Sequence, residues 1–354
     1  MSQTVANGNV GTESELGSTA DRAQKRGLTR VPLLVVALAV VVFVQALFVS
    51  SYVGALHHPR PHHVGFGVVG TSPLPSAVGK QFSLKTTRYA SESAALSAID
   101  HRKIDGAIVA GPAGSKLLVV PAAGAAGATA LSNAFSAAAA GLHQKVVIVP
   151  THPLPSGDAS GAVSFFVVMA LIVGGYLSSS IGLAFGGRAT RRGRLAALAI
   201  VAVIGALLTD TLAGPVLGAV PTSKFLVLWG IFTLVMMAVA FATAALQTVL
   251  GAAGTLVVVV VFVIFGAPAS GGTVPAPYLP GIWRILGPYL PAGAGTTTVR
   301  NTIYFDGNRI TTSLLVLAAY LVVGAAAVIL IRQRHRPSAE EVEAESAAAV
   351  GAVV

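Results

Sequence analysis

Long apolar runs constrain this chain more than any other feature of its sequence. A helix needs about 20 consecutive apolar residues to cross the hydrocarbon core of a bilayer. The sequence also has few charges: 10% of its 354 residues are charged and 54% are hydrophobic, whereas about 25% are charged in a typical soluble domain. We therefore predict an α-helical polytopic membrane protein with about six transmembrane helices. The predicted spans are residues 31–53, 163–185, 195–217, 225–246, 248–267 and 312–331.

Two of these spans have an alternative interpretation. The first run is longer than the roughly 7–15 apolar residues of a signal peptide, and no A-x-A site follows it, so we favour an uncleaved anchor over a cleaved signal. The fourth and fifth runs are nearly continuous, and one helix of about 43 residues would far exceed a bilayer. Gln247, Gly251 and Gly254 favour a tight turn between them.

Basic residues set the predicted orientation. Clusters at 22–30, 188–194 and 332–336 all fall on one side of the membrane if there are six spans. The positive-inside rule assigns that side to the cytoplasm, although Lys224 places one positive charge on the opposite side and is weak evidence against this orientation. We therefore expect a multi-pass protein of the cell membrane with two disordered cytoplasmic tails, residues 1–30 and 332–354.

Residues 54–162 are predicted to form a small extracytoplasmic α/β domain with Pro-rich linkers. Helices and strands alternate along it, which is typical of a mixed α/β or α+β layer structure. The expected strands are 64–69, 107–109, 116–120 and 145–149, and the expected helices are 91–99 and 128–140.

The motifs argue against several functions. The net charge is +10, but the basic residues form no dense stripe, so we expect no nucleic acid as a partner. There is no cysteine, no P-loop, no H-E-x-x-H and no G-x-S-x-G. We expect no enzyme activity, no catalytic residue and no cofactor. His57, His58, His62 and His63 follow the first span and could bind zinc or copper. Adjacent histidines in an extended chain point apart, so we favour a polar Pro-rich linker and expect no metal.

Two candidate functional sites lie in or beside the spans. Asp210 is the one formally charged residue inside a predicted span. An intramembrane carboxylate can serve a proton relay or a substrate contact, but we favour a water-exposed or helix-capping role near Gly214 and Pro215. The second candidate is the basic loop between the second and third spans. A simple topology signal and lipid-headgroup anchor explains it, and a docking surface for a cytoplasmic partner is expected only from the resemblance described below. Its arginines are Arg188, Arg191, Arg192 and Arg194.

The segment 268–311 is predicted to be an outer loop, with a re-entrant arrangement as one option. It contains a short amphipathic piece between Pro280 and Pro291, and Trp283 and Tyr289 suit a membrane interface.

This last region resembles the C-terminal half of ABC-2-type membrane proteins, in the branch called YhgE/Pip (phage infection protein-like). The plan of one anchor helix, an outside domain and five further helices also matches that branch, and residues 100–110 (DHRKIDGAIVA) match it more loosely. The matching residues are Gly251, Gly254, Ser270, Gly271, Gly272, Pro275, Leu279, Pro280, Leu290, Pro291 and Arg300.

The resemblance implies the permease subunit of an exporter. Such subunits dimerise, here as a homo- or heterodimer in the lipid bilayer, and work with a separate ATP-binding subunit. The almost wholly apolar spans favour an amphipathic or lipid-like substrate that moves outward. Two alternatives stay open: a non-transporting envelope receptor or scaffold, and a proton-driven exporter that depends on Asp210.

Overall fold

A computed structural model describes residues 35–36, 38–79, 82–112, 114–185 and 190–331. The chain divides into two compact units, residues 1–50 and residues 51–354. In the first unit the described residues belong to an apolar helix, Leu38–Leu56, whose last turns enter the second unit. All other elements belong to the second unit. The tails predicted at 1–30 and 332–354 lie outside the described residues.

A five-stranded sheet forms the centre of the sheet domain, residues 64–150, with the strand order β2-β1-β3-β4-β5. Strand β1 pairs in parallel with β2 on one side and with β3 on the other. Strand β4 pairs antiparallel with β3 and parallel with β5. The strands are β1 Val64–Val69, β2 Leu84–Tyr89, β3 Gly106–Gly111, β4 Gly114–Val119 and β5 Val146–Pro150.

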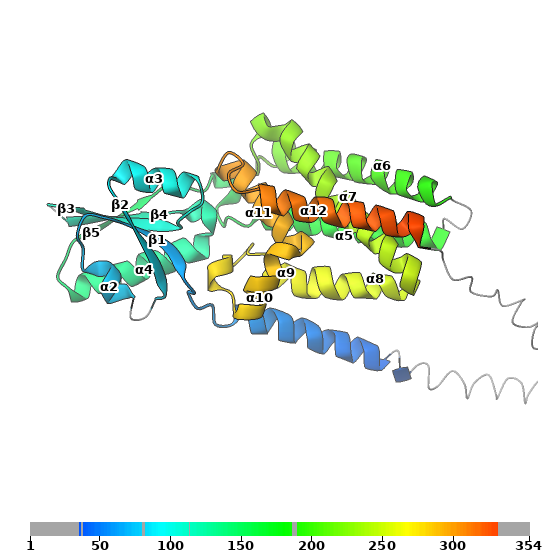
Figure 1. The fold of residues 1–354 in the computed structure, drawn as a ribbon, viewed down its shortest axis with the longest axis horizontal. Coiled ribbons are helices and arrows are strands. Elements are labelled where there is room, and N and C mark those ends of the chain that lie inside the picture. Colours follow the sequence, from blue (N-terminus) through cyan, green and yellow to red (C-terminus); the bar gives the residue numbers. More distant parts are fainter. Residues whose placement is uncertain (1–34, 37, 80–81, 113, 186–189, 332–354) are drawn as a thin grey trace, which may run out of the picture. The chain divides into compact units, whose positions relative to one another are not determined.

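Helices cover both faces of this sheet (Figure 1). On one face α2 (Leu74–Val78) and α4 (Ala125–Gly141) enclose a core in which Phe66 stacks on Phe135 with ring centres 4.8 Å apart. On the other face α3 (Glu92–Asp100) buries Ile99 in a second core. Four strands and two helices were predicted close to these bounds, whereas β2 and α2 were not.

The second unit also contains a helix bundle around α7, Phe225–Leu250. Helix α7 packs against α5, α6 and α12, because its Phe232, Val235 and Val239 are fully buried. The surrounding helices are α5 Val163–Phe185, α6 Arg191–Thr211 with a π-helical end at Leu212–Val216, and α12 Thr311–Leu330.

Within the described residues, five helices are long and apolar enough to cross a membrane, one fewer than the six predicted. The helix predicted at 248–267 is a shorter apolar helix, Ala253–Ala269. Helix α7 continues to Leu250, and the chain turns at Gly251 with φ +63°, so the next helix starts late. It consists of α8 (Ala253–Val258), a π-helical segment (Val259–Phe265) and α9 (Gly266–Ala269). At about 1.5 Å per residue it falls short of a bilayer core of about 30 Å.

The predicted outer loop at 268–311 is largely helical. Its longest element is α11, Pro291–Tyr304, which is buried along most of its length and contacts α5, α7 and α12. The shorter elements are the 3-10 helix Ala276–Tyr278, α10 Gly281–Leu286 and the 3-10 helix Gly287–Tyr289.

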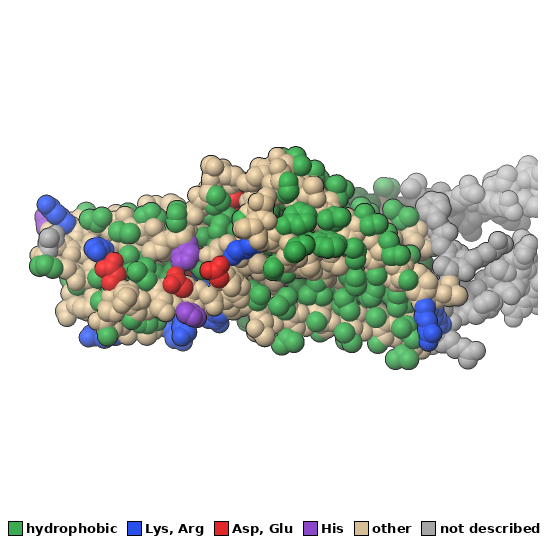
Figure 2. Space-filling view, turned by 90° about the horizontal axis from the view of Figure 1, so that it is seen from above, with side chains coloured by type: hydrophobic (Ala, Val, Ile, Leu, Met, Phe, Trp, Pro, Cys, Tyr) green, Lys and Arg blue, Asp and Glu red, His purple; other side chains and the backbone are tan. Residues whose placement is uncertain are grey.

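Surface chemistry separates the two parts of this unit (Figure 2). Apolar side chains cover the bundle, and Ile204, Leu226 and Leu330 are 61%, 75% and 77% exposed. Acidic, basic and histidine side chains gather over the sheet domain instead, with a further basic group at the far end of the bundle. An apolar surface of this kind suits a lipid environment.

Candidate functional site

Arg300 on α11 is buried where the sheet domain meets the bundle. Its side chain is 6% exposed. Nη1 donates to the carbonyl oxygen of Gly271 and Nη2 donates to that of Gly272, each at 2.7 Å. The planar guanidinium is suited to hold two acceptors at once. Arg300 therefore fixes the turn that follows α9 to the buried helix α11.

The turn itself needs glycine. Gly271 has φ +71°, a conformation that side chains disfavour. A Cβ on Gly272 would lie 2.6 Å from the Cβ of Phe165 at the start of α5. Ser270 supports the turn, because its hydroxyl accepts from the Gly272 backbone N–H at 3.1 Å and donates to the Ala267 carbonyl at 2.7 Å.

Asp158 links the same helix to the start of α5. Its Oδ1 accepts from the backbone N–H groups of Ala162 and Val163, at 2.8 and 3.1 Å, which caps α5. Its Oδ2 accepts from the Tyr304 hydroxyl at 2.7 Å. We call Arg300, Tyr304, Asp158 and the turn 270–272 the junction cluster.

Burial controls the electrostatics of the junction cluster. Desolvation, with a contribution from the charge of Arg102, lowers the pKa of Arg300 to about 10, while Asp158 and Tyr304 act in the opposite direction. Arg300 therefore remains a cation at neutral pH. Burial and the hydrogen bond to Asp158 raise the pKa of Tyr304, so this hydroxyl remains a donor.

The sheet domain is attached on both sides of this cluster. The Tyr278 hydroxyl donates to the Gly127 carbonyl of α4 at 3.1 Å. At the other end of α11, Phe305 lies in the second core of the sheet domain and stacks on His152. Arg309 donates to the Arg102 carbonyl at 3.0 Å. Contacts that precede and follow α11 in the chain therefore link this part of the bundle to the sheet domain.

A second buried polar group lies at the opposite end of the bundle. Gln247, 2% exposed, accepts from Nη2 of Arg194 and from the Ser179 hydroxyl, and its amide donates to Ser180 and Thr255. These residues come from α5, α6, α7 and α8. We call them the distal network.

The distal network changes the role expected for the basic loop. Arg194 is half-buried and faces inward to Gln247, so its guanidinium belongs to the bundle interior rather than to a docking surface. Arg191 donates to the Ile329 carbonyl at the end of α12, at 2.9 Å. Arg192 is exposed, and Arg188 lies outside the described residues.

Asp210 lies inside α6 and is fully buried. Neither carboxylate oxygen makes a hydrogen bond of standard geometry among the described residues, and the Trp229 backbone is the polar group that acts on it. Helix α6 continues through Thr211 into the π-helical segment Leu212–Val216, so Asp210 caps no helix end. The expected alternatives of a cap or a water-exposed group are wrong for this structure.

The four linker histidines do not converge. Within the part of the chain that the structure describes, no group of three His, Asp or Glu side chains is placed to hold a metal ion. His57 contacts the Val53 carbonyl through Nδ1, and His62 lines a groove of the sheet domain that contains neither His57 nor His58.

The structure brings together four of the loop residues predicted from the sequence, namely Ser270, Gly271, Gly272 and Arg300. Pro280 and Pro291 stand apart, at the beginnings of α10 and α11. Sequence reasoning missed Asp158 as a cluster member and the distal network as a whole. The signal for the network was three consecutive serines at 178–180 and a lone Gln247, all within apolar runs.

The chain matches no family model, no curated protein and no solved structure.

Proposed function

We propose that this chain is the membrane-spanning subunit of an ABC-2-type exporter, which works with a separate ATPase in trans and moves an amphipathic or lipid-like substrate outward. In this proposal the tails and the loop 186–190 face the cytoplasm, and the sheet domain lies outside. The subunit acts as a homo- or heterodimer in the cell membrane.

The observation that carries the proposal is the junction cluster. An exporter that opens toward an outside domain needs that domain attached to the moving helices, because a flexible link would transmit no displacement. Tyr278 provides such an attachment through its direct hydrogen bond to Gly127 of the sheet domain. Arg300 and Tyr304 hold the adjoining parts of the bundle, the turn 271–272 and the start of α5. The residues of the turn also carry the resemblance to the ABC-2 branch.

The distal network supports the other half of the mechanism. Arg194 follows the α5–α6 loop directly, and its contact with Gln247 reaches the α7–α8 turn. A cytoplasmic partner that moves this loop would therefore displace α7 and α8. The hydroxyl groups of Ser180 and Thr255, 3.2 Å apart, can exchange hydrogen bonds during such a movement.

The proposal is tested by purifying the tagged full chain with lipid in mild detergent and identifying bound proteins by mass spectrometry. We expect a stoichiometric subunit that contains a P-loop ATPase. We further expect Arg192→Ala to weaken its recovery, because Arg192 is exposed at the start of α6 and, unlike Arg191 and Arg194, makes no hydrogen bond to the described bundle. Arg284→Ala at the other end of the bundle should leave recovery unchanged. A homo-oligomer without an ATPase would contradict the proposal and favour a receptor or scaffold.

A proton-driven exporter is a second candidate, because Asp210 is a buried carboxylate without a hydrogen bond of standard geometry in the described structure. The two candidates differ in the effect of Asp210→Asn. A proton-driven exporter loses transport in vesicles with a pH gradient, whereas an ATP-driven exporter retains its ATPase subunit and its ATP-dependent transport.

A further inference from the structure

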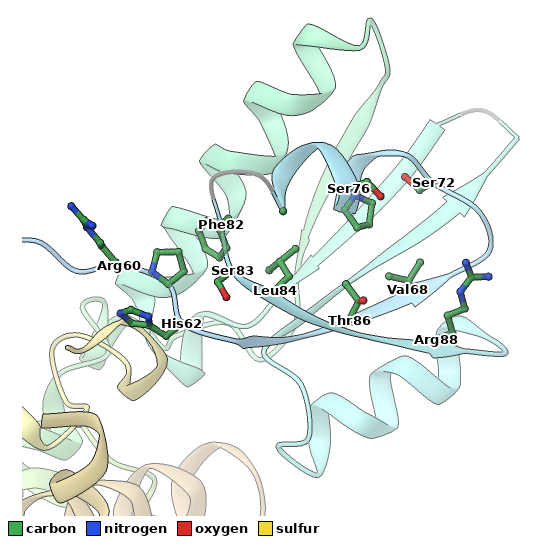
Figure 3. A pocket seen from close by; sticks show the side chains of 13 residues that line it. Arg60, His62, Val68, Ser72, Ser76, Phe82, Ser83, Leu84, Thr86 and Arg88 are labelled. Atoms are coloured by element: carbon green, nitrogen blue, oxygen red, sulfur yellow. The ribbon is translucent and has the colours of Figure 1, made fainter. Parts of the chain in front are cut away.

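An open groove of about 820 Å³ lies on the sheet domain between α2 and the edge strand β2 (Figure 3). The fold leaves it uncovered because α2 has only five residues and cannot shield the whole face of β2. Leu84, Thr86 and Arg88 alternate along β2 and all line the groove. Lys85 lies between them in sequence and does not line it.

The groove is positively charged at both ends. Figure 3 places Arg60 at one end and Arg88 at the other, with His62 close to Arg60. No Asp or Glu is among the residues that line it. Both guanidinium groups are exposed and, within the described residues, neither makes a hydrogen bond or an ion pair. Two unpaired arginines without acidic neighbours favour an anion.

Between these ends the lining is polar but uncharged. The hydroxyl groups of Ser72, Ser76 and Thr86 lie along it, beside the apolar side chains of Val68 and Leu84. Figure 3 shows Leu84 between Arg60 and Arg88. Strands rise by about 3.3 Å per residue, so the β2 backbone alone separates Leu84 from Arg88 by about 13 Å. A small anion such as orthophosphate cannot reach both ends.

The Arg60 end is fixed to the rest of the protein. The backbone N–H of Arg60 donates to the Tyr278 carbonyl at 3.1 Å, and that of His62 donates to the Pro277 carbonyl at 2.8 Å. Tyr278 is itself buried and bonded to Gly127 of α4. The spacing of the groove's two charged ends is therefore set by the fold and not by a free linker.

We propose that this groove is a binding site for an elongated anion that carries phosphate-type groups about 13 Å or more apart, with one group on Arg60 and His62 and another on Arg88. The site does not depend on whether the chain transports anything, because binding requires neither an ATPase nor a membrane potential. A free anionic chain and a lipid headgroup bearing several phosphates share this chemistry.

The test uses the full chain in discs of zwitterionic lipid, with linear polyphosphate as the probe and calorimetry at low and at physiological salt. We expect saturable binding of polyphosphate that is at least about tenfold tighter than binding of orthophosphate. Arg60→Ala and Arg88→Ala should each weaken binding about tenfold, and the double variant should abolish it. The matched control is Lys85→Ala, which removes one positive charge from the same strand outside the groove.

Three results would overturn the proposal: no binding at low salt, orthophosphate binding as tightly as polyphosphate, or Lys85→Ala weakening binding as much as Arg88→Ala. The last result would show general attraction to a basic surface. A further arm replaces the zwitterionic lipid with an anionic lipid. If the anionic lipid competes with polyphosphate, and Arg60→Ala removes this competition, the site binds lipid headgroups. If the anionic lipid leaves polyphosphate binding unchanged, the site binds a free anionic chain. Both outcomes support an anion site.

Discussion

Two arginines at opposite ends of the bundle, the buried Arg300 and the half-buried Arg194, are held in different ways. Arg300 in the junction cluster donates to two backbone carbonyls, whose positions are fixed by the turn and by α9. Arg194 in the distal network donates to Gln247 and, more distantly, to Ser179, which are side chains with rotatable groups. A guanidinium that donates to backbone carbonyls has one arrangement of hydrogen bonds. A guanidinium that donates to side-chain amides and hydroxyls has several, because these groups can rotate. The comparison indicates a rigid joint beside the sheet domain and an adjustable contact at the far end.

The largest effect should follow from removing the rigid contact. Arg300→Met leaves two buried carbonyls without a donor, and each buried group left unsatisfied costs about 1–3 kcal/mol. We expect a large fall in the unfolding temperature of the full chain in lipid discs, measured by scanning fluorimetry. Arg284→Met is the matched control, because Arg284 on α10 is only partly buried. Equal shifts in both variants would remove the distinction drawn for Arg300.

A smaller loss of stability is expected from Gly272→Ala. The new methyl group would overlap Phe165 at the start of α5, and overpacking of this kind costs about 1–3 kcal/mol. Gly281→Ala provides the control, since no atom lies within 4 Å of the position its Cβ would take. The same thermal measurement should show a lower unfolding temperature for Gly272→Ala alone. A tolerated alanine at 272 would mean that the turn is not held tightly.

At the adjustable end, Arg194→Met should cost less than Arg300→Met, about 1–2 kcal/mol, because the Ser179, Ser180 and Gln247 groups can pair with one another when the guanidinium is lost. The unfolding temperatures of the two Arg→Met variants, measured side by side, check this order. The reverse order would contradict the comparison.

Two substitutions of Gln247 separate the effect of its hydrogen bond to Arg194 from the effect of its size. Gln247→Glu keeps an acceptor for Arg194, and the Ser180 and Thr255 hydroxyls can rotate to donate to the new carboxylate. Gln247→Leu keeps the size but leaves Arg194 without its partner. We expect the free energy of unfolding of Gln247→Glu to lie within about 1 kcal/mol of that of the native chain. We expect Gln247→Leu to be about 1–2 kcal/mol less stable than Gln247→Glu. If Leu is tolerated as well as Glu, the network does not hold Arg194.

The smallest effect concerns an exposed pair next to the junction cluster. Lys224 donates to Asp306 at 2.8 Å and thereby lowers the pKa of that carboxyl below its usual value. A lowered pKa in the folded state means that the pair stabilises the protein above the ordinary pKa of Asp, about 4, and that this contribution is lost as the pH falls further. Asp306→Asn should therefore have a slight effect at neutral pH and none at low pH. Unfolding temperatures across that range check the sign.

The sequence predicted those elements whose pattern of apolar side chains is typical of a helix or a strand. Strand β1 (VGFGVV) was predicted to the residue because it is apolar and rich in valine. Strand β2 (LKTTRY) was missed because it is an edge strand whose middle four side chains are exposed, which leaves no apolar alternation. Helix α7 was predicted to end at Leu246, yet it runs four residues further because Gln247 bonds inward instead of breaking the helix.

The candidate site was predictable only in part, for a physical reason. Helix α11 (PAGAGTTTVRNTIY) is rich in glycine and threonine, which have low helix propensity, so its sequence resembles a loop. Its small residues allow close packing against α5 and α7, and tertiary contacts stabilise the helix. Arg300 and the 270–272 turn were found through the resemblance. Asp158 could not be connected to them, because it lies 142 positions before Arg300 and only the fold brings the two together.

The claim that the junction cluster joins sheet domain and bundle is tested most directly by hydrogen exchange of the full chain in lipid discs, comparing the native protein with Arg300→Met. We predict faster exchange in α11 and in α4, which Tyr278 contacts, with no change at the α7–α8 turn. Faster exchange confined to α11, with α4 unchanged, would contradict the account, because the sheet domain would then be independent of the buried arginine.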